Sequence, residues 1–486
     1  MYLGIDLGTS GVKTLLIDGS QRIVGSASAS LTVSNLHHGW SEQAPVDWIA
    51  ATEEALTALS NSHSTEVSAI TGIGLSGQQH GATLLDAENN VLRPCILWND
   101  TRSHVEAAAL NANEVVAAKL GNVIFPGYTA PKLMWCRKHE PEIFAKVARV
   151  LLPKDYLRWW FTGEFVSDMS DASGTGWLDI ADREWSDEML SFTDMSRDQM
   201  PSLVEGTEVS GQLRHELAAR WGISGKAVVA GGGGDNAASA CGLGTIEPGS
   251  AFASLGTSGV LFVSNESFKP NIESAVHAFC HALPGVWHQM GVILSATDSL
   301  NWYAGLVGDS AVNLTSALGS ELQAPSSTTF LPYLSGERTP HNDAHIRGVL
   351  SGLTTSTSRQ EITRSILDGV SFAFRDNLHA LRQAGTDIAR VTAVGGGSQS
   401  AYWLKSLATA LDRPVDILSA GEFGAAFGAA RLGMIAAENA DPMEICKSAP
   451  VATTIEPVSE LREVYNDAYE RFRAHYPAMK PLSLKG

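Results

Sequence analysis

An aspartate near the N-terminus is followed by a short turn that is rich in hydrogen-bond donors. Asp6 ends a β-prone run, the turn Gly8-Thr9-Ser10-Gly11 offers backbone N–H and hydroxyl groups, and Lys13 adds a cation. A carboxylate can hold Mg²⁺ through water, turn amides can face phosphate oxygens, and a lysine adds positive charge. A plain β-hairpin with an exposed aspartate would use the same residues, because such turns are common. This segment alone leaves both interpretations open.

The same turn occurs a second time in the chain. Leu7-Gly-Thr-Ser-Gly-Val12 recurs letter for letter as Leu255-Gly-Thr-Ser-Gly-Val260, about half of the 486-residue chain further on. Both copies lie beside β-prone runs, which predicts a strand, a tight turn and a strand at each place. Two similar halves that meet at a cleft would bring the two turns face to face. The repeat therefore favours polyphosphate binding over a plain hairpin.

A second aspartate follows a run of four glycines. Gly231–Gly234 come after an apolar strand-like run, and Asp235 and Asn236 open a helix of small residues. Glycines let a backbone approach a ligand closely, and an aspartate at a helix start commonly caps the helix. In a cleft, the same carboxylate can act as a general base that orients a hydroxyl for phosphoryl transfer. Asp235 is therefore the candidate base.

Two further glycine-rich segments carry polar residues. Gln78-Gln79-His80 stands between glycines, where it could bind sugar hydroxyls or hold a structural histidine. Gly72–Gly77 just before it matches GxGxxG, but a turn and a strand follow it. Gly395–Gly397 follows a strand and opens a helix, with Asp416 further on, as in a dinucleotide fingerprint. Too little chain follows for that fold, so we expect a turn beside a nucleotide's adenosine or α-phosphate.

Histidine and tryptophan residues near these segments suggest other roles. His277 and His281 have zinc-ligand spacing if they are helical, but their flanks predict a strand and no suitable third ligand follows. Trp98, beside Asn99 and Asp100, could form the floor of a polar pocket. The turn at residues 8–11 lacks Walker A spacing, and the protein-kinase motifs are absent from the sequence.

Composition limits the class of protein. The net charge of −18 argues against nucleic-acid and anionic-membrane partners. No apolar run approaches the roughly 20 residues of a membrane helix, and the N-terminus does not resemble a signal peptide. Five scattered cysteines predict reduced thiols in a cytoplasmic protein.

The length predicts two domains, with a boundary in the turn-rich stretch 244–249. Strand-like runs at 70–75, 228–230 and 391–394 alternate with helix-like runs at 45–59 and 402–411. This alternation predicts an α/β fold with a mixed sheet in each half.

Together these segments resemble the FGGY carbohydrate kinases of the actin-like ATPase superfamily, nearly from end to end. Gly348–Leu353 through Ser365–Asp368 matches one family signature. Gly127–Trp135 matches the other, with Cys136 where an aliphatic residue is usual, a change that we expect to affect packing only. Gln79 stands where the most similar family members often carry Met. The segments 152–156, 168–171 and 330–341 also resemble those members.

The resemblance implies two actin-like (ribonuclease H-like) domains, residues 1–245 and 246–486, each a mixed sheet flanked by helices, with a catalytic cleft between them. A last helix at 458–476 is expected on the surface, with packing back on the first domain as one arrangement. The cleft would close on Mg-ATP and a ketopentose, and D-xylulose is the expected sugar, phosphorylated on its C5 hydroxyl. A homodimer is a further expectation.

The resemblance also implies roles for single residues. Asp235 would take the proton from the sugar hydroxyl, and Asp6 would support Mg²⁺, through water, and the phosphates. The implied sugar-binding residues are Gln79, His80, Asp235 and Asn236. The implied ATP-binding residues are Gly8, Thr9, Ser10, Lys13, Gly256, Thr257, Gly395, Gly396 and Gly397.

Three alternatives remain at this point. A kinase for another ketose or a polyol, such as ribulose, would differ at the Gln79–His80 turn. A non-catalytic actin-like scaffold would bind nucleotide without using Asp235 as a base. A dehydrogenase would need to bind NAD(H), which we do not expect.

Overall fold

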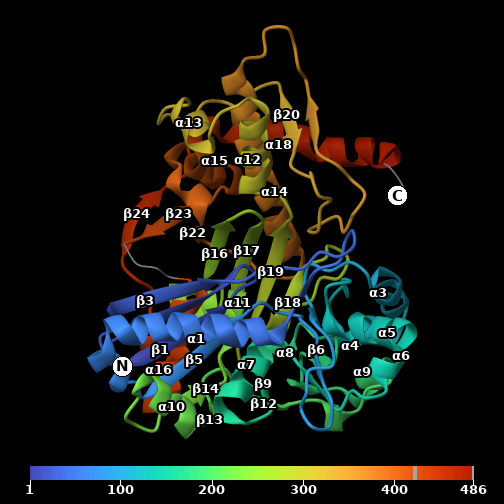
Figure 1. The fold of residues 1–486 in the computed structure, drawn as a ribbon. Coiled ribbons are helices and arrows are strands. Elements are labelled where there is room, and N and C mark those ends of the chain that lie inside the picture. The colour runs from blue at the N-terminus through green and yellow to red at the C-terminus, as the bar shows by residue number, and fades with distance from the viewer. Residues whose placement is uncertain (420–423, 484–486) are drawn as a thin grey trace.

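The computed structural model describes residues 1–419 and 424–483, and each half of the chain forms a seven-stranded sheet (Figure 1). In the first half the order is β13-β14-β5-β1-β2-β3, with β15 beside β5. The bounds are β1 (Tyr2–Leu7), β2 (Gly11–Ile17), β3 (Ile23–Ser30), β5 (Gly72–Gly77), β13 (Val209–Gln212), β14 (Val228–Ala230) and β15 (Gly233–Gly234). Strand β1 pairs antiparallel with β2 and parallel with β5, so the sheet is mixed, as predicted.

The second sheet repeats this arrangement in the order β18-β19-β17-β16-β22-β23-β24. Its strands are β16 (Ala251–Leu255), β17 (Gly259–Asn265), β18 (His277–Cys280), β19 (Trp287–Ile293), β22 (Val391–Val394), β23 (Val415–Leu418) and β24 (Val451–Ile455). Strand β16 pairs antiparallel with β17 and parallel with β22, just as β1 does with β2 and β5. The predicted strand, turn and strand at both copies of the repeat are confirmed.

The larger helices cover these sheets. They are α1 (Pro45–Ser62), α7 (Pro153–Thr162), α11 (Asp235–Leu243), α12 (Thr297–Leu306), α14 (Arg359–Gln383), α15 (Ala401–Leu411), α16 (Ala425–Glu438) and α18 (Arg462–Met479). Helix α1 starts with Pro45, a residue suited to a first turn, and buries Trp48 and Leu59 under β2 and β3. The helices predicted at 45–59 and 402–411 correspond to α1 and α15.

Smaller elements complete the description. The remaining helices are α2 (Ser64–Ser68), α3 (His104–Asn111), α4 (Glu114–Leu120), α5 (Thr129–His139), α6 (Pro141–Phe144), α8 (Met169–Ala172), α9 (Asp187–Ser191), α10 (His215–Trp221), α13 (Ala311–Ser316) and α17 (Pro442–Ile445). The remaining strands are β4 (Glu42–Gln43), β6 (Thr83–Leu85), β7 (Cys95–Ile96), β8 (Arg149–Leu151), β9 (Val166–Asp168), β10 (Leu178–Asp179), β11 (Glu184–Trp185), β12 (Ser202–Val204), β20 (Thr329–Leu331) and β21 (Val349–Ser351). The GxGxxG segment is strand β5 itself, not a phosphate loop.

One helix crosses between the halves. Helix α16 belongs to the second half of the sequence but packs on β1, β5 and α11 of the first half (Figure 1). A methyl group on Gly4, Gly74 or Gly428 would collide with the facing backbone, so small residues permit this close approach. The segment 244–249 therefore separates the two sheets in the sequence. It does not separate two independently packed domains, because α16 follows this segment and packs on the first sheet. The final helix α18 packs on β20, α14 and α15 of the second half.

Two further observations concern the helices and the cysteines. No helix in the described ranges 1–419 and 424–483 is long and apolar enough to cross a membrane. All five cysteines are buried and unbridged.

Candidate active site

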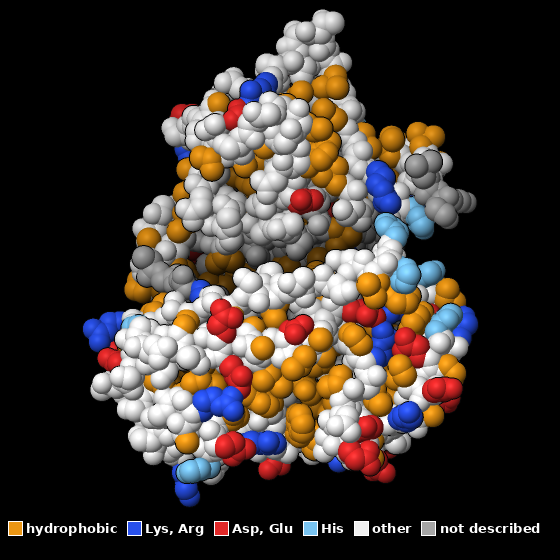
Figure 2. Space-filling view, viewed as in Figure 1, with side chains coloured by type: hydrophobic (Ala, Val, Ile, Leu, Met, Phe, Trp, Pro, Cys, Tyr) orange, Lys and Arg blue, Asp and Glu red, His pale blue; other side chains and the backbone are white. Residues whose placement is uncertain are grey.

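A cavity of about 440 Å³ lies where the two halves meet, and both copies of the repeated turn line it. The space-filling view shows the molecule hollowed between its upper and lower parts (Figure 2). The lining residues from the first half are Gly8, Thr9, Gln78, Gln79, His80, Trp98, Asp235 and Asn236. Those from the second half are Ser254, Gly256, Thr257, Ser258, Val260, His277, Phe279, Met290, Val292 and Arg338. The expectation that two similar turns meet at a cleft is confirmed.

The first turn joins β1 to β2 and carries Asp6 at its base. Asp6 stands opposite Lys13 on β2 and beside Ser76 on β5. Burial raises the pKa of Asp6, whereas the Ser76 hydroxyl and the Lys13 charge lower it. Within the described part of the chain, Asp6 Oδ1 is buried without a hydrogen-bond partner. A buried carboxylate oxygen without a partner fits a cation or a water shell.

Side chains from other segments hold the first turn in place. The Thr9 hydroxyl donates to Gln78 Oε1 at 3.1 Å and accepts from the Trp98 indole N–H at 2.9 Å. The Thr9 carbonyl oxygen accepts from Gln43 Nε2 at 2.7 Å. Trp98 also lines the polar cavity, as its sequence position suggested.

The second turn joins β16 to β17 and is held mainly by backbone groups. The Gly256 carbonyl oxygen accepts from the Thr297 N–H at 2.9 Å and from the Thr297 hydroxyl at 2.8 Å. The Thr257 carbonyl oxygen accepts from the Ala296 N–H at 2.8 Å. These donors lie at the start of α12, so the second turn is tied to that helix.

Asp235 lies where β15 passes into α11. Gly234 is the N-cap and Asp235 the first helical residue, so the predicted helix start is confirmed but the carboxylate does not cap the helix. Asn236 donates to Asp235 Oδ1 from its backbone N–H at 2.7 Å and its side-chain amide at 2.9 Å. Burial, and then the nearby Asp6 carboxylate, raise the pKa of Asp235 to about 6. Asp235 lines the first cavity, and among the described residues its second carboxylate oxygen has no hydrogen bond.

Buried polar contacts hold the glycine-rich segment that precedes Asp235. The fully buried Arg158 donates to the Gly231 carbonyl oxygen. The Gly234 N–H donates to the Ser170 hydroxyl at 3.1 Å. Because both ends of the segment are tied down, the direction of the Asp235 side chain is fixed by the protein interior.

His80, which also lines the first cavity, has a strained backbone conformation. Its φ of 69° lies in the left-handed region that non-glycine residues rarely adopt. Its carbonyl oxygen accepts from Lys132 Nζ at 2.8 Å and the Thr129 hydroxyl at 3.1 Å. Its Nδ1 lies 2.6 Å from the Gly174 carbonyl oxygen, which can only accept, so Nδ1 carries the proton and Nε2 is left as an acceptor. Burial lowers the pKa of His80 to about 3, so the ring is neutral.

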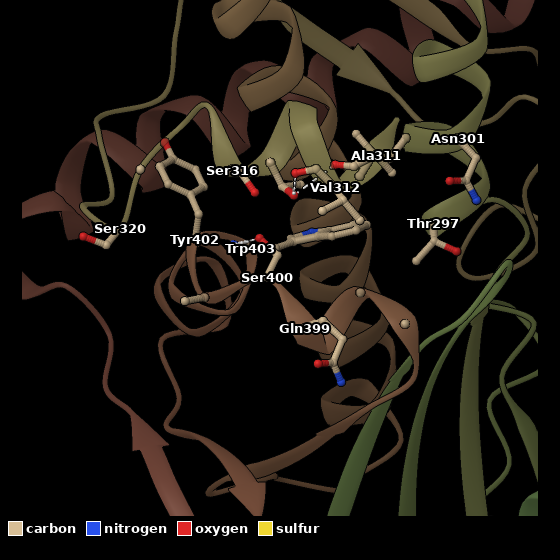
Figure 3. Close-up of a pocket in the computed structure, with 16 residues that line it drawn as sticks. Thr297, Asn301, Ala311, Val312, Ser316, Ser320, Gln399, Ser400, Tyr402 and Trp403 are labelled. Atoms are coloured by element: carbon tan, nitrogen blue, oxygen red, sulfur yellow. Dashed lines mark hydrogen bonds between the residues drawn. The ribbon is translucent and has the colours of Figure 1, made fainter. Parts of the chain in front are cut away.

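Two more cavities continue from the first along the second half. One, of about 670 Å³, shares Asn236 and Ser254 with the first and includes Gly395 and Gly396. The next, of about 440 Å³, shares Gly396 and Gln399 with the second. Figure 3 shows its walls, formed by Thr297 and Asn301 of α12, Ala311, Val312 and Ser316 of α13, and Gln399, Ser400, Tyr402 and Trp403 near the start of α15. The three cavities form one series.

Most of the residues singled out from the sequence lie along this series. Gly8, Thr9, Gln79, His80, Asp235, Asn236, Gly256 and Thr257 line the first cavity, and Gly395, Gly396 and Gly397 line the other two. Asp6 and Lys13 lie at the base of the first turn. Ser10 is exposed and lines none of these three cavities, although its carbonyl oxygen accepts from Leu31 N–H.

Sequence reasoning gave no role to several residues that line the site. Arg338 appeared only within a family-like segment, and His277 was weighed only as a zinc ligand. In the structure His277 lies on β18 and lines the first cavity together with Arg338. Thr297 and Asn301 also line the series. Their segments contain no glycine-rich turn, so no local signal identified them.

Comparison with known proteins defines the class. A model of the N-terminal domain of the FGGY family of carbohydrate kinases matches residues 1–242, and a model of the C-terminal domain matches residues 251–437. The chain belongs to this family and is an ATP-dependent carbohydrate kinase.

Several relatives that are similar over nearly the whole chain bear the name of a particular kinase. The chain is 47% identical to the xylulose kinase of Escherichia coli (strain K12), over 99% of this chain and 100% of that protein. Among solved structures, a "xyloylose kinase" from Brucella ovis is 60% identical with a TM-score of 0.98, covering 99% of this chain and 100% of that one. A xylulose kinase from Rhodospirillum rubrum is 29% identical with a TM-score of 0.92, covering 99% of each chain.

Proposed function

We propose that this protein transfers the γ-phosphoryl group of ATP to the C5 hydroxyl of D-xylulose, with Asp235 as the general base. The observation that carries the proposal is the first cavity. Its walls include Asp235, the neutral His80 and Asn236, together with both copies of the Gly-Thr-Ser-Gly turn. Relatives of nearly the same length bear the name xylulose kinase, which supports this choice of sugar.

The order of the cavities supports an extended binding mode for both substrates. The sugar occupies the first cavity between His80 and Asp235, and the triphosphate lies between the two turns. The adenosine continues past Gly395 into the cavity of Figure 3. Walls on both sides of the reacting atoms would exclude water when the halves close, which suppresses hydrolysis of ATP.

The reaction needs one proton transfer and one phosphoryl transfer. The Asp235 carboxylate accepts the proton of the C5 hydroxyl as that oxygen forms a bond to the γ-phosphorus. The bond between the γ-phosphorus and the β–γ bridging oxygen breaks, which yields D-xylulose 5-phosphate and ADP. Asn236 holds the carboxylate through two hydrogen bonds, so its free oxygen keeps one direction. Backbone N–H groups of the two turns face the phosphate oxygens.

Asp6 fits a magnesium site, since one of its buried oxygens lacks a hydrogen-bond partner in the described residues. Mg²⁺ held there through water would neutralise charge on the phosphate oxygens. Lys13, opposite Asp6 in the hairpin, adds a second positive charge at the same place.

A kinase for another ketose, such as ribulose, is the alternative. Gln79 is the residue to examine, because its side-chain amide donates to the Ser170 carbonyl oxygen and packs against Gly234. Its position is thus set by the segment that holds Asp235.

The test is ADP release with Mg-ATP across D-xylulose, D-ribulose, L-ribulose, L-xylulose, glycerol, D-gluconate and no sugar. We expect a strong response to D-xylulose, reduced about 10³-fold in Asp235→Asn because the base is lost. Asp187→Asn is the matched control, since Asp187 is also the first residue of a helix but is exposed. A response to a different sugar would identify that sugar as the substrate in place of D-xylulose. Turnover without sugar, or full activity in Asp235→Asn, would overturn the proposed mechanism.

A further inference from the structure

We propose that Arg338 binds the carbonyl end of the ketose and makes the site select ketoses over polyols. The inference rests on the proposed function and extends it from the reacting hydroxyl to the opposite end of the sugar. Arg338 comes from the second half of the chain and lines the first cavity.

A chain of contacts connects Arg338 to His80, which lines the same cavity. The His80 ring lies 4.7 Å from the Tyr128 ring, centroid to centroid. The Tyr128 hydroxyl is 3.1 Å from His277 Nδ1, and His277 Nε2 is 3.3 Å from Arg338 Nη1. The positive charge of Arg338 also contributes to the low pKa of His80, which agrees with this chain of contacts. In the proposed binding mode the C5 hydroxyl meets Asp235 and the carbonyl end of the sugar meets Arg338, which line the same cavity from different halves of the chain.

A rigid loop presents the guanidinium group. Glu337 Oε1 accepts from the Arg338 N–H at 2.7 Å and from the Leu294 N–H at 3.1 Å. The Thr339 N–H donates to the Val292 carbonyl oxygen at 3.1 Å, and the Thr339 hydroxyl accepts from the Val292 N–H at 3.1 Å. The backbone on either side of Arg338 is thus fastened to β19 and the residues that follow it.

The first half of the chain also supports the side chain. The guanidinium carbon of Arg338 lies 4.2 Å from the centre of the Phe125 ring, and His277 lies 5.4 Å from the same ring, centroid to centroid. A planar guanidinium stacked on an aromatic face keeps its edges free for hydrogen bonds. Arg338 therefore spans the cleft from one half to the other with its direction fixed.

The donors of Arg338 are mostly unused by the protein. Among the described residues, its guanidinium forms a hydrogen bond only with His277 and no ion pair with a carboxylate. Arginine has five N–H donors and no acceptor. The neighbouring lining residues Phe279, Met290 and Val292 are apolar. This end of the cavity thus combines N–H donors with an apolar wall.

Such an environment distinguishes a carbonyl from a hydroxyl group. A carbonyl oxygen only accepts hydrogen bonds, so a set of donors satisfies it completely. A hydroxyl group at the same place must also donate its proton, and the apolar wall leaves that proton without a partner. Arg338 thereby favours the C2 carbonyl of a ketose and disfavours the corresponding polyol.

The test compares D-xylulose with xylitol, the polyol formed when its carbonyl is reduced, in the wild type, Arg338→Met and Arg338→Lys. We expect Arg338→Met to lower kcat/KM for D-xylulose about 10- to 100-fold, because one charged hydrogen bond is lost. For xylitol we expect less than about a threefold change, so the preference for the ketose collapses. Arg338→Lys should retain part of the preference, since lysine keeps the charge but not the planar fork.

Arg347→Met is the matched control, because Arg347 lies in the same loop region, is exposed and bonds only to nearby carbonyl oxygens among the described residues. ADP affinity and the melting temperature report whether each Arg338 variant is folded. If Arg338→Met does not fold, the ketose preference of Arg338→Lys decides the question. Equal losses for both sugars, or an unchanged preference, would overturn the inference. A wild type inactive on every ketose would instead overturn the proposed function, and this inference with it.

Discussion

The two copies of Leu-Gly-Thr-Ser-Gly-Val have the same sequence but form different turns. In the first, Leu7 pairs with Val12 and four residues form the loop, closed by a hydrogen bond from Gly8 N–H to the Gly11 carbonyl oxygen. In the second, Leu255 pairs with Gly259 and only three residues form the loop. Identical residues therefore adopt two registers, and the difference must come from what each turn contacts.

The contacts differ in kind. Side chains of Gln43, Gln78 and Trp98 surround the first turn, whereas backbone donors at the start of α12 hold the second. The strands differ as well, because Asp6 precedes the first copy and Ser254 the second. The first turn is therefore fixed by side chains and lies beside the Asp6 carboxylate, whereas the second is fixed by the start of α12, and both line the first cavity.

The largest expected effect is a difference in kcat between substitutions at Asp6 and Ser254, the equivalent positions that precede the two turns. Asp6→Asn should lower kcat about 10²- to 10³-fold, because it removes the charge that supports the metal and the phosphates. Ser254→Ala, at the equivalent position before the second turn, should change kcat less than about threefold. Steady-state kinetics with D-xylulose and Mg-ATP measure both. Similar losses in the two variants would show that the turns share one role.

Removing a side-chain anchor should affect the first turn strongly. Gln43 donates to Thr9 and accepts from Trp48 Nε1 at 3.0 Å and Gln78 Nε2 at 3.1 Å. Gln43→Leu leaves these buried groups unpaired, so we expect the free energy of unfolding to fall by about 2–4 kcal/mol. Denaturant unfolding measures it, and a loss below about 0.5 kcal/mol would contradict the side-chain anchoring of this turn.

The segment that supports the second sheet should make stability depend on pH. Glu337 is buried beside Leu294, and burial raises its pKa to about 8. The folded state therefore keeps a proton that the unfolded state releases above pH 4.5. The contribution of Glu337 is full below pH 4.5 and declines by up to about 1.4 kcal/mol per pH unit as the pH rises toward 8.

Glu337→Gln keeps a neutral hydrogen-bonding group and removes this titration. We expect the melting temperature of the variant to fall less than that of the wild type between pH 5 and pH 8. The difference between the two curves isolates Glu337 from other titrating groups. Parallel curves would show that Glu337 is ionised in the folded protein.

The smallest expected effect concerns the backbone anchor of the second turn. Thr297→Val removes the hydroxyl donor to the Gly256 carbonyl oxygen but retains the backbone donor from the same residue. We expect KM for ATP to rise about fivefold, equivalent to one hydrogen bond of about 1 kcal/mol, with KM for the sugar unchanged. A larger effect on the sugar would contradict the assignment of this turn to the nucleotide.

The sequence predicted much of the fold because the repeat and the glycine runs are local signals. Strand, turn and strand around both copies, and a helix that starts at Asp235, follow from residue types alone. The two registers could not be predicted, since they depend on Gln43 in one case and on α12 in the other. The residues of the turn do not indicate which distant segments will contact it.

Part of the site could not be predicted from the sequence either. His80 was singled out by its flanking glycines, but its positive φ depends on Lys132 and Thr129. Arg338 and His277 lie 61 residues apart in the sequence and meet only through the folding of the second sheet. The crossing of α16 depends on glycines in both halves. A glycine in the sequence does not show which other segment packs against it, so this contact could not be predicted.

The crossing of α16 also determines when the first half can fold during synthesis. A nascent chain that has reached residue 245 contains the whole first sheet but not the helix that covers one of its faces. Buried residues of that face, such as Tyr2 and Leu15, pack against Phe427 and Met434. Until residue 438 of 486 has left the ribosome, these apolar side chains remain without their partner. The N-terminal half is thus completed only after α16 has been synthesised, and we expect a fragment ending at residue 245 to aggregate when expressed alone.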